Sequence, residues 1–567
     1  MLASASLGAH AQSADPIVQT SLGKVEGTTD INKGVKEFKG IMFATANRFS
    51  MPIPVTRWIG VKDAKHFGSA CPQAARYNLT EQSLNENCLS LNVTTPLHIK
   101  AKEKLPVLLW IHGGAFVGGG SNLYRLDKLS NQGHLVVVSI NYRVGLFGFM
   151  PHPAMDPASN GDLGLEDQRV GMRWVQKNIA AFGGDPNNVT IAGESAGAGS
   201  ICQHLASPEQ VKGLFHKAIL MSGACLQELP TLKNALDKSP IWDAVAKDTK
   251  DPNRKFSCPV PADSGYTAAA SLQCLKNVSV ENLLEAQTYE AGNQLLSFVP
   301  STGNTTVPRS FKEAISSGKV VKVPIINGGA QNELRLYVAY DVLGSNGTKT
   351  KYPVNPEKVN AHYLPAFYGT DNGRFTLILK RYFKSASKPV HLNGATLGSM
   401  LSDYNPNFGI NNCLYLKTAN AYNGVKGMLP IYEYEFGDPA ALVLGVGIAQ
   451  GENPGFTLGA VHSAILNYFF PNLSNTNVID APDLPVASQQ LANQMVAYFA
   501  NFARTGKPFL AGQPAWPKYN GTHAQPSSPS VLFFTPSNIH TYTAYGDNNS
   551  SATNGHQCAY WDSVFPE

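Results

Sequence analysis

Two continuous apolar runs mark the most clearly predicted strands of this sequence. Residues 106–111 read Pro-Val-Leu-Leu-Trp-Ile, and residues 135–140 read Leu-Val-Val-Val-Ser-Ile. Strands that are buried on both faces have this continuous pattern, whereas strands with one solvated face alternate apolar and polar residues. Residues 16–27 and 37–44 are shorter and mixed, and we expect them to form strands of an N-terminal meander.

Helical patterns separate the later strands, at residues 166–181, 207–213 and 488–504. Such alternation predicts a mostly parallel sheet with helices on both sides. The stretches 230–322 and 340–455 are less regular and richer in Pro, Asn and Gly, so we expect helical excursions from the sheet there. In an open α/β sheet, insertions of this kind overhang the carboxyl edge, where ligands bind.

The composition describes a globular chain with ample core. Of its 567 residues, 43% are hydrophobic and 15% are charged. No apolar run approaches the roughly 20 residues that span a bilayer, so no transmembrane segment is predicted. The net charge of +5 is small for this length and no dense Lys/Arg run occurs, so nucleic-acid binding has no support.

The chain has no internal repeat and no linker that demands a domain boundary, so we expect one domain over residues 12–567. Residues 1–11 are small and mostly apolar and end in Ala-His-Ala. This ending is typical of the remnant of a secretory signal peptide, which would make the protein secreted or periplasmic. A native N-terminus with little order is the alternative.

The eight cysteines include no C-x-x-C pair, which argues against a zinc ribbon or a thioredoxin-type site. Their even number suits an oxidising compartment. Cys71 and Cys88 could close one loop, which would contribute about 3 kcal/mol if unstrained, and Cys258 and Cys274 are spaced for another. The sequence does not fix the connectivity, and fully reduced cysteines remain the alternative.

A possible nucleophile lies near the middle of the chain. The strand-like run 189–192 leads into residues 193–197, Gly-Glu-Ser-Ala-Gly, which match the pattern G-x-S-x-G. In this pattern the serine, here Ser195, occupies a sharp turn between a strand and a helix with its hydroxyl exposed. Glycines are needed because strand and helix pass so close that a β-carbon would collide. With 51 glycines the bare pattern could arise by chance, but its strand–turn–helix context favours the catalytic interpretation.

Candidate donors for an oxyanion surround this serine in the expected fold. Residues 112–116, His-Gly-Gly-Ala-Phe, directly follow the first buried strand. An H-G-G-x segment in this place supplies backbone N–H groups that form an oxyanion hole with the N–H after the nucleophile. The predicted donors are Gly114, Ala115 and Ala196, and a glycine-rich turn without function is the alternative. Residues 118–120 are three glycines without the lysine of a phosphate-binding loop.

Several further segments occur in a fixed order along the chain: Ala-Cys-Pro-Gln at 70–73, Glu-Asn-Cys-Leu-Ser-Leu-Asn at 86–92, Asn-Tyr-Arg-Val-Gly at 141–145, Gly-Asp-Leu-Gly-Leu-Glu-Asp-Gln-Arg at 161–169 and Phe-Gly-Gly-Asp-Pro at 182–186. With these segments the chain resembles the type-B carboxylesterases, the cholinesterase-like branch of the α/β-hydrolase fold, from about residue 18 to residue 565. The resemblance implies a large, mostly parallel sheet with helices on both faces and helical insertions over the active site. It also implies hydrolysis of a small-molecule carboxylic ester without a metal or organic cofactor.

The resemblance further implies a catalytic triad in the chain order Ser, Glu, His. Glu333 follows the strand-like residues 324–328, and His462 lies in the segment Gly-Ala-Val-His-Ser at 459–463. Both match the positions of the family's acid and base. Without the resemblance, Glu333 would be taken for a surface acid and His462 for a packed core histidine.

Other matched positions imply two structural ion pairs and a third disulfide: Arg48–Glu86, Arg143–Asp167 and Cys413–Cys558. Solvated charges are the alternative for the ion pairs. On this interpretation Cys202 and Cys225 remain as free, buried thiols.

The chain departs from the family in three places. Residues 44–49 shorten the family's usual Pro-Pro-x-Gly stretch, and the loop between Cys71 and Cys88 contains no Trp, which makes choline esters doubtful substrates. Three residues after His462, Ile465 stands where the family often has a carboxylate.

The sequence therefore predicts a serine carboxylic-ester hydrolase that acts through a covalent acyl-enzyme and exists as a monomer or homodimer. A lipase with a lid at the Cys71–Cys88 loop is one alternative. A non-catalytic binding protein is another, although such relatives commonly lack the nucleophile. Candidate pocket residues, although side chains of this kind are more often part of the core, are Phe116, Phe298, Leu334, Tyr337 and Phe456.

Overall fold

The computed structural model describes most of the chain, and residues 1–11, the expected remnant of a signal peptide, lie outside the described part. The described residues are 15–565 except 76–81, 240, 243–255, 292–297, 345–353, 355–358, 369–371, 383–393, 407, 442–452, 472, 474–482, 521–529 and 544–555.

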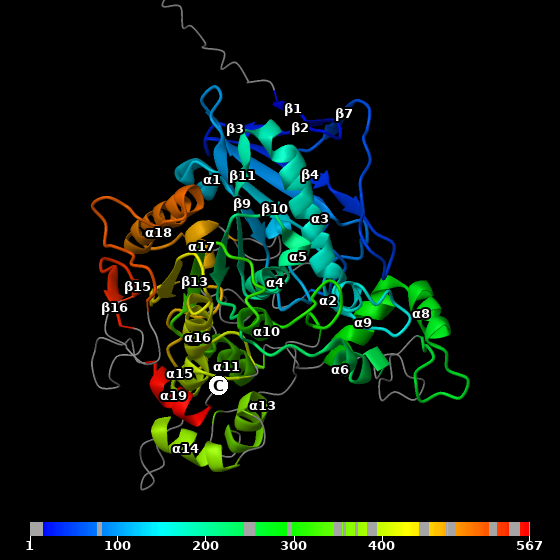
Figure 1. Ribbon diagram of the computed structural model, residues 1–567, viewed down its shortest axis with the longest axis vertical. Helices are drawn as coiled ribbons and strands as arrows, with labels where there is room; N and C mark the ends of the chain where they lie inside the picture. The colour runs from blue at the N-terminus through cyan, green and yellow to red at the C-terminus, as the bar shows by residue number, and fades with distance from the viewer. Residues whose placement is uncertain are drawn as a thin grey trace, which may run out of the picture.

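A large twisted sheet of eleven strands forms the centre of the molecule (Figure 1). The strands from β15 to β10 in the order below run parallel, and the strands at both ends pair antiparallel. In spatial order they are β16 (His540–Tyr542), β15 (Val531–Phe534), β14 (Ile431–Phe436), β13 (Ile325–Ala330), β12 (Lys217–Met221), β11 (Gly184–Glu194), β9 (Leu105–Ile111), β10 (Val136–Ile140), β8 (Ser90–Pro96), β4 (Val35–Met42) and β3 (Thr28–Asp30).

The two continuous apolar runs form neighbouring strands at the centre of this sheet, as predicted. They are β9 and β10, in which every residue is buried. The meander predicted at the N-terminus contributes β4 to the large sheet. Its other strands, β1 (Ile17–Gln19) and β2 (Lys24–Glu26), form a separate small sheet with β7 (Val61–Asp63), and β5 (Ala44–Thr45) pairs with β6 (Ile53–Pro54).

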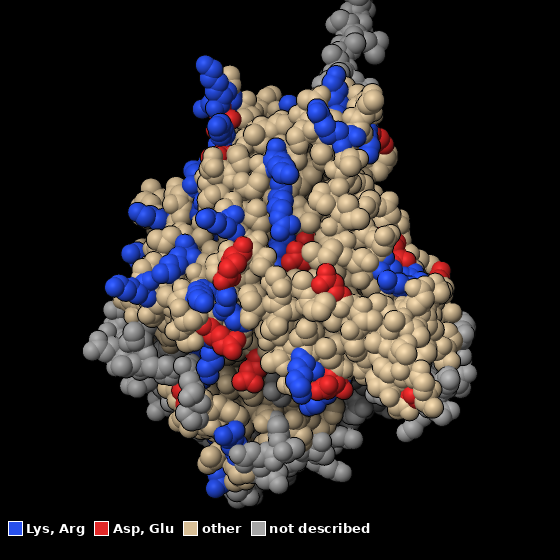
Figure 2. All heavy atoms as spheres, turned by 45° about the vertical axis from the view of Figure 1, so that its right-hand side comes forward, with Lys and Arg blue, Asp and Glu red and all other residues tan. Residues whose placement is uncertain are grey.

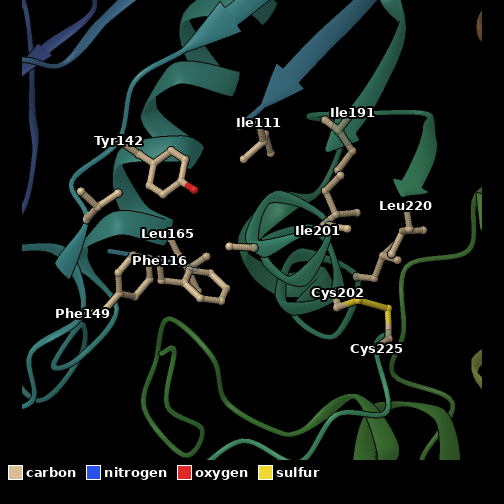
Figure 3. Packing of buried hydrophobic residues seen from close by; sticks show 14 of the residues in the cluster. Ile111, Phe116, Tyr142, Phe149, Leu165, Ile191, Ile201, Cys202, Leu220 and Cys225 are labelled. Carbon is tan, nitrogen blue, oxygen red and sulfur yellow. A yellow bond between two sulfur atoms is a disulfide. The ribbon is translucent and has the colours of Figure 1, made fainter. Parts of the chain in front are cut away.

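Helices cover both faces of the sheet, and alternate residues of each strand pack against different helices. In β9, Val107 and Leu109 belong to the apolar cluster that includes α3 (Leu163–Asn178) and α4 (Ala196–Leu205). Leu108 of the same strand belongs to the cluster with α1 (Asp127–Gly133), α17 (Leu466–Phe469) and α18 (Val486–Thr505). The continuous apolar pattern thus follows from burial on both faces. Figure 3 shows the first cluster around α4.

The irregular stretches form helices that gather in the lower half of Figure 1, at the end of the sheet where β11 passes into α4. Two short helices belong to the connections between sheet strands: η2 (Ile179–Phe182) precedes β11, and α5 (Pro208–Val211) precedes β12. The excursions contain α6 (Leu232–Asp237), α8 (Ala268–Asn277), α9 (Val280–Ala291), α10 (Phe311–Ser316), η3 (Val359–Tyr363), α13 (Leu364–Tyr368), α14 (Asn372–Tyr382), α15 (Gly394–Asp403) and α16 (Asn412–Asn423). In the same half of the molecule lie α11 (Arg335–Leu343), which follows β13 and leads into the second excursion, and the C-terminal α19 (Cys558–Val564).

Charges are spread thinly over the surface. On the face in Figure 2, Lys and Arg side chains lie singly or in small groups, with acidic side chains among several of them. No helix in the described part of the chain has both the length and the apolarity needed to cross a membrane.

Both ion pairs implied by the resemblance are present. Nε and Nη2 of Arg143 donate to the two carboxylate oxygens of Asp167 at 2.8 and 2.7 Å, and both side chains are buried. Arg48 Nε donates to Glu86 Oε2 at 3.0 Å in a more exposed setting. Because a buried charge without its partner is costly, the first pair matters more to the fold.

Four disulfides join the eight cysteines, and one of them corrects the expectation of free thiols. Three are the pairs that the sequence suggested: Cys71–Cys88, Cys258–Cys274 and Cys413–Cys558. Cys202 and Cys225 form the fourth, with Cα atoms 4.9 Å apart (Figure 3). The expectation failed because α4 packs on β12, which brings the segment after β12 beside Cys202. Matching positions to the family does not reveal that contact.

The loop that each disulfide closes predicts its effect on stability. Cys413 and Cys558 are separated by 145 residues, so the bridge removes much entropy from the unfolded chain, and the Cys413→Ala/Cys558→Ala variant should lose up to about 5 kcal/mol. The matched variant Cys258→Ala/Cys274→Ala opens a separation of only 16 residues and should lose about 3 kcal/mol or less. Denaturant unfolding of both variants measures the two losses of unfolding free energy. An equal loss, or a larger loss for Cys258→Ala/Cys274→Ala, would contradict the prediction.

Candidate active site

Ser195 lies at the turn between β11 and α4, with φ 57° and ψ −125°. This backbone is strained for any residue with a β-carbon. The glycines on either side permit it, because a β-carbon on Gly193 would lie 2.7 Å from the carbonyl carbon of Gly197, and one on Gly197 would collide with the carbonyl oxygen of Ile111. The predicted reason for the two glycines is therefore confirmed.

The structure brings the three predicted triad residues into one hydrogen-bonded row. His462 Nε2 lies 2.9 Å from Ser195 Oγ, and His462 Nδ1 lies 2.8 Å from Glu333 Oε2. His462 and Glu333 are buried, whereas Ser195 is partly exposed. Glu333 lies in the turn between β13 and α11, and His462 lies in the turn before α17. The sheet thus delivers the three side chains from distant parts of the chain to one edge.

Glu333 is fixed from two further directions. Its Oε1 accepts hydrogen bonds from the main-chain N–H of Ala330 at 2.8 Å and from the hydroxyl of Tyr415 at 2.9 Å. Burial and the nearby charge of Glu333 raise the pKa of Tyr415 well above its ordinary value, so the phenol stays protonated and donates. Tyr415 belongs to α16 and carries no sequence signal that would have marked it.

A second buried carboxylate approaches the histidine, and the sequence analysis gave it no role. Glu194, the residue before the nucleophile, has its Oε1 at 3.4 Å from His462 Nε2. Burial raises the pKa of Glu194 above its ordinary value. Burial lowers the pKa of His462, but the charges of Glu194 and Glu333 and the hydrogen bond to Glu333 outweigh this, so that the pKa lies above 6.5.

The glycine-rich segment after β9 lies directly against the nucleophile. A β-carbon on Gly113 would lie 3.0 Å from the β-carbon of Ser195. Gly114 and Ala115 have φ values of 118° and 55°, which turn this segment sharply before Val117 and Gly118 donate back to the carbonyl of Gly114. Gly113, the residue before the proposed donors Gly114 and Ala115, thus lies against Ser195, and the third proposed donor, Ala196, begins α4.

Buried polar contacts hold this segment in place. The ring of His112 stacks on Tyr142 at 4.2 Å between centroids, and the hydroxyl of Tyr142 donates to the carbonyl of His112 at 2.7 Å. Burial lowers the pKa of His112 to about 4, so this imidazole is neutral at physiological pH. Gln73 exchanges two hydrogen bonds with the main chain of Gly119, at 2.7 and 2.8 Å.

The candidate pocket residues separate into two groups. Tyr337 is partly buried and lies 5.8 Å from the ring of His462, so it belongs to the site. Phe116, Phe298 and Leu334 are at most 5% exposed and belong to the core, and Phe456 packs against Gly394. Ile465 is likewise fully buried among apolar residues. In the described residues, no group of three or more His, Cys, Asp or Glu side chains is arranged to hold a metal ion.

A parallel sheet that carries a serine on a strand–helix elbow, with a histidine and a carboxylate beside it, defines an α/β-hydrolase. A model described as "Carboxylesterase family" matches residues 14–545. The chain belongs to the carboxylesterase family, a class of carboxylic ester hydrolases.

Its relatives cover nearly the whole chain. It is 31% identical over 517 residues to the para-nitrobenzyl esterase of Bacillus subtilis (strain 168), covering 89% of this chain and 92% of that protein. It is 30% identical over 538 residues to the pyrethroid hydrolase Ces2a of Mus musculus, covering 90% and 87%. Among solved structures, a carboxylesterase of Geobacillus stearothermophilus superimposes with a TM-score of 0.70 at 28% identity, covering 93% of this chain and 97% of that one.

The strained backbone at Ser195 predicts an unusual stability effect. Ser195→Gly and Ser195→Ala both remove the hydroxyl, but only glycine adopts this backbone without strain, so the glycine variant should be more stable by about 1 kcal/mol. Ser200, inside α4, is the matched control, since there glycine should be less stable than alanine by about 1 kcal/mol. Chemical denaturation of the four variants gives both differences, and the same sign at both positions would contradict the strain at Ser195.

Proposed function

We propose that this protein hydrolyses carboxylic esters through a covalent acyl-enzyme on Ser195. The observation that carries the proposal is the row Ser195–His462–Glu333, with 2.9 Å between Oγ and Nε2 and 2.8 Å between Nδ1 and Oε2. A serine hydroxyl is a weak nucleophile until a base takes its proton, and the base needs a third group that orients it.

In the proposed acylation, Nε2 of His462 accepts the proton of the Ser195 hydroxyl while Oγ attacks the ester carbonyl. Glu333 accepts a hydrogen bond from the Nδ1–H group, which keeps its proton; the carboxylate thereby fixes this tautomer and stabilises the imidazolium. Collapse of the tetrahedral intermediate breaks the bond to the alcohol oxygen, which takes the proton from Nε2. The alcohol leaves, and the acyl group remains on Ser195.

Deacylation uses the same groups in the same roles. Water gives a proton to Nε2 of His462 and attacks the acyl carbonyl, and the second tetrahedral intermediate collapses with return of the proton to Ser195 Oγ. The carboxylic acid leaves and the enzyme is restored. The proposed route requires neither a metal nor an organic cofactor.

The N–H groups of Gly114, Ala115 and Ala196 are the proposed donors to the oxyanion. Their support is the contact of Gly113, the residue before Gly114, with Ser195 and the position of Ala196 at the start of α4. The N-terminal end of a helix carries partial positive charge and stabilises a developing anion there. Each such donor contributes a factor of about 10² to 10³ in rate.

Small-molecule esters are the proposed substrates, and two relatives carry names that refer to para-nitrobenzyl and pyrethroid compounds. A lid-gated lipase finds less support, because the described base of the Cys71–Cys88 loop is tied to Gly119 through Gln73. The middle of that loop, residues 76–81, lies outside the described residues. A non-catalytic binding protein would not need the ordered row at Ser195.

We further propose that the protein is secreted or periplasmic, that residues 1–11 are the remnant of a signal peptide, and that residues 12–567 form one domain, as a monomer or homodimer. Four disulfides support the oxidising compartment, in which such bonds form and persist.

Ser195→Ala should abolish turnover of an ester such as p-nitrophenyl butyrate, with a fall of at least about 10³-fold, because no other group supplies the nucleophile. A fluorophosphonate probe followed by peptide mass spectrometry should modify Ser195 in the unaltered protein and should not react with the variant. Ser316→Ala, on the exposed side of α10, is the control and should retain both properties. Near-native activity of Ser195→Ala would rule out the assignment.

The state of His462 predicts the pH dependence. The base must be neutral, and the two carboxylates raise its pKa above 6.5, so kcat/KM should fall as the pH drops through that pKa. Glu333→Gln removes one negative charge, so the acidic limb should move to lower pH while the rate falls by about 10² to 10⁴. A profile that stays flat between about pH 5 and pH 8 would exclude His462 as the base.

A further inference from the structure

The imidazole of His462 lies between two buried carboxylates, and the two approach different nitrogens. Glu333 binds Nδ1 at 2.8 Å, on the side away from the nucleophile. Glu194 lies on the other side, where Nε2 is 2.9 Å from Ser195 Oγ and 3.4 Å from Glu194 Oε1. Nε2 must receive the serine proton and pass it to the leaving alcohol, so a carboxylate that took this hydrogen bond for itself would compete with the reaction.

Ser463 is the residue that holds Glu194. Its hydroxyl donates to Glu194 Oε1 at 2.8 Å, which is the same oxygen that faces Nε2. Burial raises the pKa of Glu194, and this hydroxyl and the main-chain N–H of Ser463 both counteract the rise by hydrogen bonding to the carboxylate. The donor pair thus favours the charged form of a carboxylate that is only 2% exposed.

The backbone of Ser463 has an unfavourable conformation, and the hydrogen bond from its hydroxyl to Glu194 offsets that conformational energy. Its φ of 65° lies in the left-handed region, which glycine adopts more readily than serine. The same turn leads from His462 into α17, so the hydroxyl is fixed to the element that carries the base.

We propose that Ser463 is a positioning residue for the ester hydrolysis proposed above: its hydroxyl holds the Glu194 carboxylate beside Nε2 of His462, where the charge stabilises the imidazolium without displacing Ser195. The two distances from Nε2 support these different roles of Ser195 and Glu194. The 2.9 Å to Ser195 Oγ is a hydrogen bond, whereas the 3.4 Å to Glu194 Oε1 is a longer, mainly electrostatic contact. The proposal rests on the proposed function.

The titratable groups around Glu194 determine which protonation changes can alter the pH profile of the enzyme. His462 and Glu333 are the charged neighbours, and the phenols of Tyr124, Tyr415 and Tyr434 also interact with Glu194. Burial raises the pKa of each phenol above its ordinary value of 10.0, so all three stay neutral in an assay near neutral pH. A shift of the acidic limb therefore reports on His462 and its two carboxylates.

The test compares Ser463→Ala and Ser463→Gly with the unaltered protein in pH profiles of kcat and KM. Without the hydroxyl, Glu194 takes up a proton more readily and no longer raises the pKa of His462. We expect the acidic limb of kcat/KM to move to lower pH by about half a unit or more, and kcat to fall about tenfold with little change in KM. In a Glu194→Gln background, the same two substitutions should produce no further shift.

Ser537→Gly is the matched control, since Ser537 also has a left-handed φ, of 62°, but lies exposed between β15 and β16. It should leave the profile unchanged. Near-native kinetics of Ser463→Gly beside a damaged Ser463→Ala would show a backbone role and overturn the proposal. An unmoved limb, or a limb moved to higher pH, would do the same.

Labelling of Ser195 distinguishes a failure of the inference on Ser463 from a failure of the proposed function. If the unaltered protein hydrolyses esters and its Ser195 is labelled, but the Ser463 variants keep its pH profile, only the inference on Ser463 fails. If the unaltered protein neither turns over esters nor reacts with the fluorophosphonate, the proposed function itself fails.

Discussion

The contact on which the site depends is the close approach of two backbones at the end of the sheet. Gly193 and Gly197 bring the end of β11 and the start of α4 against the carbonyl oxygen of Ile111 at the end of β9. The segment after β9 carries two proposed oxyanion donors, and the turn after β11 carries Ser195. This contact between backbones thus sets the position of the nucleophile relative to those donors. Any larger residue at either glycine would push the two apart.

The other residues of the site stabilise a charge that burial would otherwise make costly. In the proposed mechanism His462 gains and loses a proton in the protein interior, where an isolated charge is unstable. Two carboxylates stabilise its charged form, and they in turn are buried. Glu333 receives hydrogen bonds from Ala330 and Tyr415, and Glu194 receives them from the hydroxyl and the main-chain N–H of Ser463. The donors are as much part of the arrangement as the charges, because each carboxylate would otherwise be unsolvated.

Local features of the chain were enough to predict the two central strands and the elbow. β9 and β10 are continuous apolar runs because helices cover both faces of the sheet, and the elbow glycines are required by a local clash. Glu333 and His462 carry no comparable local signal, so only the resemblance to a family could single them out. Tyr415 and Ser463 were missed altogether. Each acts on a carboxylate far away in the chain, at separations of 82 and 269 residues, and a hydroxyl becomes informative only when folding brings its acceptor close.

The disulfides also differ in when the growing chain can form them. Cys71–Cys88, Cys202–Cys225 and Cys258–Cys274 join cysteines 17, 23 and 16 residues apart, so each pair emerges almost together during synthesis. Cys413 must wait for Cys558, which follows 145 residues later, close to the end of the chain. In the interval Cys413 is a single reactive thiol exposed to wrong partners. Closure of this last bridge requires α19 to lie against α16, so the bridge records that the two helices have met.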